Sequence, residues 1–287
     1  MVAGAGNGEK SERKRHSLTK REVIMMGAVD LFTLEGKVAI VTGASVGLGA
    51  CFAEAMAEAG ADVVGADFQE KLLYETMERI GKLGRRVLAI PTDVTKEQDV
   101  RRMVETTVKE FGSLDIIINN AGIAGKSHPI HELSFEDWDK VVQVNLNGVF
   151  FCIREAAKVM IKQKRGKIIN IASVWGLVGT SSVAPLPHYA ATKGAVVNLT
   201  REAALEYAKY GMNVNAIAPG FFGGTQLALG MGVEDLSGFI NKAEAIIPTG
   251  KFGVASDLKG TAIYLASRAS DAVTGHILSI DNGIAAW

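Results

Sequence analysis

Short apolar segments alternate along the chain with longer segments in which apolar residues recur at helical spacing. The apolar segments of strand length are residues 38–42, 61–66, 87–91, 114–119, 167–173, 213–218 and 277–280. The longer segments predict amphipathic helices over residues 48–59, 71–83, 97–111, 135–164, 189–210 and 256–267. Strands that are apolar on both faces need a helical layer on each side, as in a parallel sheet. The pattern therefore predicts an α/β fold, a doubly wound single-domain Rossmann fold with a seven-stranded parallel sheet.

Residues 1–30 depart from this pattern, because glycines and charged residues of both signs replace the apolar periodicity. Such a composition is typical of a disordered tail, so we expect the folded unit to span residues 31–287. No segment is long and apolar enough to cross a bilayer, and the N-terminus lacks the apolar segment of a secretory signal. We expect a cytoplasmic protein with no membrane partner.

The charge balance and the cysteines narrow the class of protein further. Lys and Arg number 31, and so do Asp and Glu, which leaves a formal net charge of +0. Such a chain has no net field to attract a polyanion, so nucleic acid is not expected as a partner. Cys51 and Cys152 cannot form a disulfide framework, and we expect reduced thiols.

A cluster of glycines joins the first predicted strand to the first predicted helix. Gly43 permits a tight turn, Gly47 lets the backbone approach a ligand, and Gly49 lets the helix pack closely on the strand. The N–H groups at such a helix N-terminus can bind an anion such as a pyrophosphate. The Gly-x-x-x-Gly-x-Gly spacing differs from the usual dinucleotide fingerprint, so a plain turn is the alternative.

Two carboxylates follow the next strands. Asp67 ends the second strand, where this fold places an acid that binds the adenosine ribose hydroxyls. Asp93 holds the corresponding place after the third strand, and an N-cap for the following helix is its alternative role.

A phenol, an ammonium and a hydroxyl form the candidate chemical centre. Tyr189 and Lys193 are four residues apart, and therefore share one face of a helix. A cation near a phenol favours the phenolate and so assists proton transfer. Ser173 ends the fifth predicted strand, at the edge where open α/β sheets bind ligands. Each feature taken alone is more typical of an ordinary structural residue.

Together, these residues resemble the short-chain dehydrogenase/reductase family, in its classical branch, over about residues 34–283. The resemblance rests on short motifs in one order: Thr42–Gly49, Asp93-Val94, Asn119–Gly122, Asn145, Ser173, Tyr189-x-x-x-Lys193 and Pro219-Gly220.

The resemblance implies a role for each residue of the centre. Tyr189 would exchange a proton with the substrate oxygen, and Ser173 would hydrogen-bond that oxygen. Lys193 would bind the nicotinamide ribose and lower the pKa of Tyr189, while Asn145 would hold a water that links Lys193 to solvent. The implied cofactor-binding residues are Gly43, Ser45, Val46, Gly47, Leu48, Gly49, Asp67, Phe68, Asp93, Val94, Asn120, Ala121, Gly122, Tyr189, Lys193, Pro219, Gly220, Phe222 and Thr225.

Three positions depart from the family pattern. The separation of Ser173 from Tyr189 is slightly long, which leaves Ser181 and Ser182 as alternative hydroxyls. Thr225 comes one place later than usual after Pro219-Gly220. Asn282 replaces a glycine near the C-terminus, which suits a turn with a positive φ.

The substrate side of the site is predicted to be apolar. Residues 219–233 carry no charge but include Phe221, Phe222, Leu227, Leu229 and Met231, which suggests an apolar lid. Trp175, Val178 and Leu186 are further candidates for its walls, or for contacts between subunits. His188 is either a substrate ligand or a surface histidine at a helix N-terminus. Neither region supplies an Arg to bind an anionic substrate, which favours a small neutral alcohol or ketone.

These observations predict an enzyme that interconverts a secondary alcohol and a ketone. Asp67, with Val46 in the glycine turn, favours NAD over NADP as the cofactor, and no metal is expected. The alternatives are a 3-oxoacyl-carrier-protein reductase and a non-catalytic protein that senses dinucleotides. The apolar faces of helices 135–164 and 189–210 further predict a homotetramer or homodimer.

Overall fold

The computed structural model describes residues 27–223, 231–232 and 235–286. Of the tail expected over residues 1–30, residues 1–26 therefore lie outside the described residues. Its last residues enter a short 3-10 helix, η1 (Val29–Phe32). The single folded unit over residues 31–287 stays a prediction.

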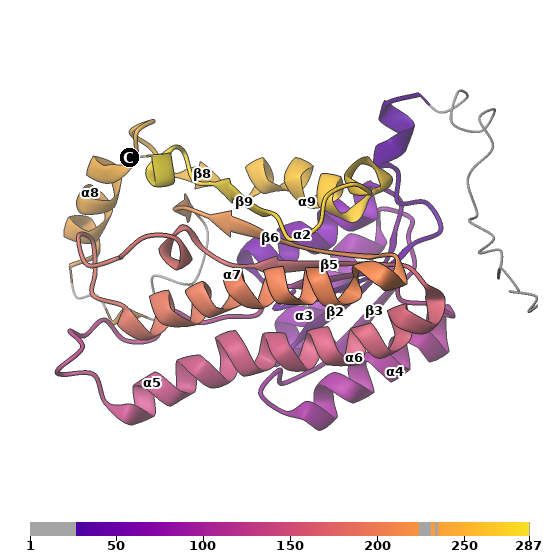
Figure 1. Ribbon diagram of the computed structural model, residues 1–287, viewed down its shortest axis with the longest axis horizontal. Coiled ribbons are helices and arrows are strands. Elements are labelled where there is room, and N and C mark those ends of the chain that lie inside the picture. Colours follow the sequence, from indigo (N-terminus) through magenta and orange to yellow (C-terminus); the bar gives the residue numbers. More distant parts are fainter. Residues whose placement is uncertain (1–26, 224–230, 233–234, 287) are drawn as a thin grey trace, which may run out of the picture.

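A parallel sheet forms the centre of the molecule and confirms the fold class (Figure 1). Its strand order is β3-β2-β1-β4-β5-β6-β9. The strands are β1 (Val38–Thr42), β2 (Asp62–Asp67), β3 (Val87–Pro91), β4 (Ile116–Asn119), β5 (Gly166–Ile171), β6 (Met212–Pro219) and β9 (Ile277–Ile280). The order reverses direction between β1 and β4, and ligands of such sheets bind at this switch point, beyond the carboxyl ends of the strands.

Helices cover both faces of the sheet because every strand presents apolar residues on both sides. On one face, α2 (Gly47–Glu58), α3 (Glu70–Gly81) and α9 (Lys259–Ala266) bury Phe52, Leu73 and Leu265. On the other, α4 (Glu97–Phe111), α6 (Gly148–Gln163) and α7 (Pro187–Tyr207) bury Met103 and Ile153. None of the helices in the described part of the chain is long and apolar enough to cross a membrane.

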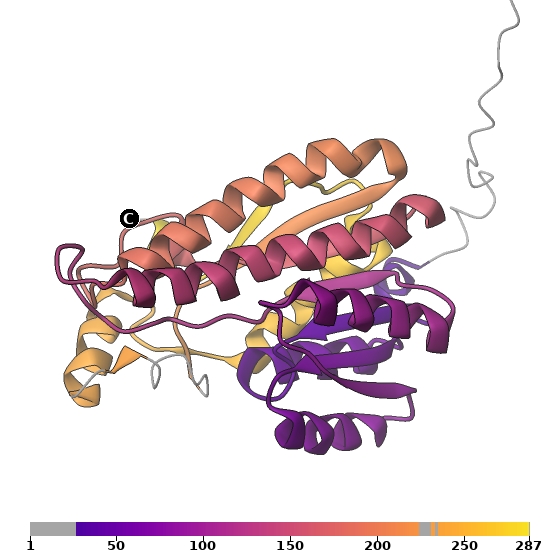
Figure 2. The ribbon, with the colours of Figure 1, turned by 90° about the horizontal axis from the view of Figure 1, so that it is seen from below.

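The long helix predicted over residues 135–164 is interrupted by a wider turn. It consists of α5 (Phe135–Val142), the π-helical turn η2 (Gln143–Asn147) and α6. This rod lies beside α7 in both views (Figure 1 and Figure 2). A π-turn rotates the residues on either side of it relative to a regular helix, and such turns are frequent at functional sites. Here the turn carries Asn145, so the interruption places this residue toward α7.

Several elements were not predicted from the sequence. They are β7 (Phe222–Gly223), α8 (Leu236–Ile246), β8 (Gly253–Val254) and the 3-10 helices η3 (Val174–Gly176), η7 (Arg268–Ser270) and η8 (Ile284–Ala286). The 3-10 helices η4 (Ala208–Tyr210) and η6 (Ala255–Leu258) lie at ends of segments that were predicted as α-helix. With the segment before α7, α8 forms a third apolar cluster over the carboxyl end of the sheet, and this cluster includes Trp175, Tyr189 and Phe239. At the turn after β9, Asn282 has a φ of 57°, as its replacement of glycine suggested.

Candidate active site

The glycine turn has the geometry that its three glycines predict. Gly43 and Gly47 have φ values of 67° and 57°, in the left-handed region that other residues rarely adopt. A Cβ atom on Gly49 would lie 1.8 Å from the Gly43 carbonyl oxygen, so any side chain there would displace α2 from β1. No side chain caps the N-terminus of α2, where the N-cap residue is Val46. The first N–H groups of α2 are thus suited to bind an anion.

Asp67 lies directly beside this turn. Its carboxylate accepts hydrogen bonds from the backbone N–H of Ser45 at 3.1 Å and of Gln69 at 2.9 Å. Thr76 donates to the Ser45 carbonyl at 2.8 Å, which fixes the turn from the side of α3. Asp67 is buried, whereas the neighbouring Phe68 is 74% exposed. The carboxylate is therefore held rigidly at the carboxyl end of β2.

The residues after β4 bind back to the glycine turn. Asn120 donates through its amide to the Thr42 carbonyl at 2.9 Å and to the Gly43 carbonyl at 3.3 Å. The Thr42 hydroxyl accepts from the N–H groups of Asn120 and Ala121 at 3.0 and 3.1 Å. On Gly122, a Cβ atom would lie 3.2 Å from Asn145 Oδ1. This set stiffens the switch point between β1 and β4.

Asp93 stabilises a turn and is not the N-cap of the next helix. Its carboxylate accepts from the N–H and hydroxyl of Thr95 at 3.0 and 2.7 Å, and the N-cap of α4 is Lys96. Burial acts to raise the pKa of Asp93, but the hydrogen bonds from Thr95 and Lys96 outweigh it, and the pKa falls below its ordinary value. The N-cap alternative for Asp93 is therefore wrong.

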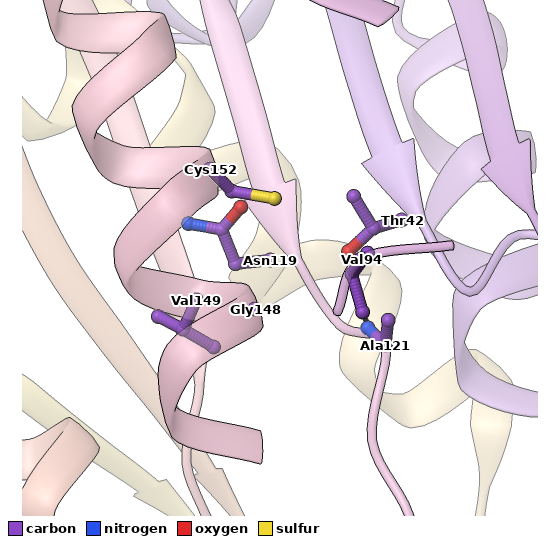
Figure 3. A pocket seen from close by; sticks show the side chains of 7 residues that line it. All are labelled: Thr42, Val94, Asn119, Ala121, Gly148, Val149 and Cys152. Carbon is purple, nitrogen blue, oxygen red and sulfur yellow. Dashed lines mark hydrogen bonds between the residues drawn. The ribbon is translucent and has the colours of Figure 1, made fainter. Parts of the chain in front are cut away.

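A small cavity lies between α6 and the residues at the ends of β1, β3 and β4 (Figure 3). Its lining consists of Thr42, Val94, Asn119, Ala121, Gly148, Val149 and Cys152, and it has no room for a water molecule. Asn119 donates to Asn170 Oδ1 at 2.8 Å, while its own Oδ1 is buried without a partner. Burial raises the pKa of the Cys152 thiol to about 12. Cys152 is thus a packing residue and not a reactive thiol, and both cysteines are free as expected.

The structure brings Ser173, Tyr189 and Lys193 together at the carboxyl end of β5. All three are at most 5% exposed. Ser173 Oγ accepts from the backbone N–H of Trp175 at 3.2 Å. Lys193 Nζ donates to the Ile171 carbonyl at 2.7 Å and lies 5.7 Å from the centre of the Tyr189 ring. A strand end and one helix face therefore converge on one point, as the spacing predicted.

Burial dominates the protonation of this group. It raises the pKa of Tyr189 to about 12, against a hydrogen bond with Ser173 that lowers the pKa, so the expectation that Lys193 lowers this pKa is wrong. Burial also lowers the pKa of Lys193 to about 8. Tyr189 is therefore protonated at neutral pH and suited to donate a proton. The contact with Tyr189 also favours Ser173 over Ser181 and Ser182, which are both exposed.

Asn145 ties three elements together. Its Oδ1 accepts from the N–H of Ile123 at 2.9 Å, and its Nδ2 donates to the Ile123 carbonyl at 2.8 Å and to Thr192 Oγ1 at 3.4 Å. Thr192 in turn donates to the Tyr189 carbonyl at 2.9 Å. The sequence reasoning missed Thr192, although it lies inside the Tyr-x-x-x-Lys motif and is a hydroxyl next to Lys193.

Aromatic rings close the substrate side. Phe221 stacks on Phe252 with ring centres 5.2 Å apart, and meets Trp175 and Phe239 edge to face at 5.5 and 6.1 Å. We call these four residues the aromatic wall. Phe221 follows Pro219 and Gly220, and Phe222 is buried. Thr225, Leu227 and Leu229 lie outside the described residues, while the described Met231 is buried in the same cluster.

His188 is fully buried, so the prediction of a surface histidine is wrong. A Cβ atom built on Gly125 would lie 2.3 Å from His188 Nε2, which shows that the ring faces the backbone of the loop after β4. Its position at N2 of α7 gave no sign of this burial, because the loop that covers it comes from a distant part of the sequence. In the described part of the chain, no three His, Cys, Asp or Glu residues are grouped as a metal site would need.

Comparison with known proteins gives the family. A family model described as enoyl-(acyl carrier protein) reductase matches residues 43–285. The 2-dehydro-3-deoxy-D-gluconate 5-dehydrogenase of Dickeya dadantii is 41% identical over 256 residues, which cover 89% of this chain and 98% of that protein.

Solved structures agree with this match. A gluconate 5-dehydrogenase from Burkholderia cenocepacia, in complex with NADP and tartrate, has a TM-score of 0.83 at 36% identity and covers 91% of this chain and 100% of that one. The structure of NAD+-bound xylitol dehydrogenase has a TM-score of 0.81 at 30% identity, and the match covers 87% of this chain and 99% of that one.

The fold and these matches define a Rossmann-type oxidoreductase. The chain belongs to the short-chain dehydrogenase/reductase family. The two solved relatives named above bind a nicotinamide dinucleotide. This protein is an oxidoreductase of the short-chain type that acts on a secondary alcohol or ketone.

Proposed function

We propose that this protein is an NAD(H)-dependent dehydrogenase that interconverts a neutral secondary alcohol and the corresponding ketone. The observation that carries the proposal is the convergence of Ser173, Tyr189 and Lys193, all buried, at the end of β5. The matched family model and the similar proteins are named as enzymes, which argues against the alternative of a non-catalytic dinucleotide sensor.

The residues present fit a dinucleotide. The uncapped N-terminus of α2 suits the pyrophosphate, the buried carboxylate of Asp67 suits ribose hydroxyls, and Gly122 leaves space beside Asn145. The bound cofactor would supply the hydride chemistry. Lys193 would hold the nicotinamide ribose, and Gly220 with Phe222 would border the nicotinamide end.

The protein's own residues handle the proton. A ketone oxygen that gains negative charge during reduction needs a proton donor and a second polar contact. Tyr189 is protonated at neutral pH and would donate its proton to that oxygen, while the Ser173 hydroxyl would hydrogen-bond the same atom. Trp175 of the aromatic wall and Tyr189 belong to one apolar cluster, and such apolar surroundings would strengthen both contacts.

The preference for NAD rests on charge. Val46 stands in the glycine turn and Phe68 follows Asp67, so neither position supplies a cation for a 2′-phosphate. An open depression of about 480 Å³ beside the turn has Arg79 and Lys259 in its lining, but both are paired with Glu54, at 2.7 and 2.8 Å. One solved relative binds NADP and another binds NAD+, so the family does not decide the cofactor. The proposed preference for NAD therefore rests on the residues of this chain alone.

A sugar acid is the second candidate substrate, because the relatives' names describe dehydrogenases of such acids. The loop after β4 provides a cation, Lys126, which lies 3.6 Å from Asp137. The neutral class remains first because the aromatic wall is apolar and Lys126 already pairs with Asp137.

A substrate panel tests both candidates. Cyclic ketones with NADH, sugar acids such as gluconate with NAD+, and a 3-oxoacyl thioester with each reduced cofactor would be compared by kcat/KM. We expect the neutral ketones to be the best substrates. If sugar acids are preferred, and Lys126→Met removes that preference, the second candidate replaces the first. Preference for the thioester would indicate the acyl-carrier-protein reductase.

A further inference from the structure

A histidine with no role in the proposed proton transfer is buried next to Tyr189. His188 is fully buried, and neither ring nitrogen makes a well-directed hydrogen bond, although the Leu186 backbone lies close enough to favour the charged ring. A buried ring whose nitrogens are poorly satisfied costs free energy, so its presence here calls for a further role.

The ring of His188 supports the loop between β4 and α5, residues 120–134. Gly125 of this loop has a φ of 74°, and its backbone passes directly over the ring. A Cβ atom there would meet both His188 Nε2 at 2.3 Å and Val141 Cγ2 at 2.6 Å. Only glycine fits this position, both for its φ and because the histidine ring already fills the space.

The supported loop borders the substrate side of the site. Ile123 exchanges two hydrogen bonds with Asn145. Ser127 donates through its N–H to the carbonyl of Met231 at 3.0 Å and through its hydroxyl to the carbonyl of Pro185 at 3.2 Å. The position of this loop therefore sets the position of Met231, which belongs to the same apolar cluster as Tyr189 and Trp175.

We propose that His188 is a positioning residue, whose uncharged ring holds the β4–α5 loop against α7 and so keeps the substrate side of the site formed. It acts through Gly125 and does not touch the substrate. The part of this inference that concerns the substrate rests on the proposed function, whereas the part that concerns the loop does not.

The surrounding charges make the support dependent on pH. Burial lowers the pKa of His188. Asp137 of α5 and a backbone hydrogen bond with Leu186 oppose this lowering, and His128 of the loop adds to it. Asp137 is itself engaged by Lys126 at 3.6 Å. On α7, Tyr189 and Lys193 are turned toward Ser173 and Ile171. A proton on His188 thus introduces a poorly compensated charge beneath the loop, and acid should release it.

The test compares His188→Ala with His188→Phe, an uncharged ring of similar shape, and with His131→Ala as a control at an exposed histidine. His188→Leu is a second uncharged replacement should the larger ring overfill the site. Hydrogen exchange of the Ile123 and Ser127 amides reports the loop without any substrate. KM for the ketone, KM for NADH and kcat report the site.

For His188→Ala we expect faster exchange at both amides. We also expect KM for the ketone to rise about tenfold, because a packed loop that is populated about one tenth of the time lowers the apparent affinity by that factor. KM for NADH and kcat should change by less than about twofold. Phe or Leu should restore wild-type behaviour at neutral pH. Between pH 7 and 5, KM should rise in wild type and stay flat in His188→Phe.

Unchanged exchange in His188→Ala would overturn the proposal. If both uncharged replacements are as defective as Ala at neutral pH, a ring nitrogen contacts the substrate and the positioning role is wrong. Equal rises of KM with acid in wild type and His188→Phe would also count against it. If wild type reduces no ketone, the proposed function fails, and the exchange experiment still decides whether His188 holds the loop.

Discussion

Asp67 offers the sharpest quantitative test of the proposed function. Its carboxylate is buried and fixed by the N–H groups of Ser45 and Gln69 at 3.1 and 2.9 Å, so it cannot turn away from a ligand at the end of β2. A 2′-phosphate about 4 Å away would be repelled by about 4 kcal/mol at an effective dielectric constant near 20. This corresponds to a preference for NADH over NADPH of up to about 10³-fold, before screening and relaxation reduce it.

The assay is kcat/KM for one ketone with NADH and with NADPH, in wild type, Asp67→Asn and Asp62→Asn. Asn at position 67 carries no charge and keeps an acceptor for one of the two N–H groups, which bind different oxygens of Asp67, so we expect the preference to fall at least tenfold. Asp62 begins the same strand and pairs with Arg86 at 2.7 Å, and its replacement should leave the ratio unchanged. A wild type that prefers NADPH, or a ratio that is the same in Asp67→Asn, would refute the role of Asp67.

Three further predictions follow from the site and from the helix surfaces. Tyr189→Phe should keep NADH binding, measured by fluorescence, but lose about 10² to 10⁴ in kcat, typical of a lost general acid; turnover near wild type would exclude Tyr189 as the proton donor. The pKa of Lys193 is lowered to about 8, so the ammonium loses its proton as pH rises through that value, and ketone reduction should decline above about pH 8; a rate that is flat up to pH 10 would contradict this. Phe150 on α6 and Leu205 on α7 are 43% and 78% exposed, so light scattering should report a dimer or tetramer, and a stable monomer at micromolar concentration would disprove the expected oligomer.

The sequence by itself determined the layers of the fold and the local chemistry of the motifs. Apolar strands such as β1 and β4 can only be buried in a sheet covered on both faces, and this follows from composition and period alone. The positive φ at Gly43 and Asn282 and the shared helix face of Tyr189 and Lys193 are likewise local properties of the chain. Such features depend on neighbours in sequence and could therefore be predicted.

Tertiary structure decided what depends on partners from distant segments. The burial of His188 needs Gly125, which precedes it by more than sixty positions in the printed chain, and no period in α7 indicates that contact. The π-turn around Asn145 arises where the long helix meets the loop of Ile123, so a regular helix was predicted instead. The pKa values of Tyr189 and Lys193 are set by burial, which exists only once β5, α7 and the aromatic wall have assembled around them. Motifs thus fix which groups are available, and packing fixes their charge and their neighbours, because desolvation and contact are properties of the assembled fold.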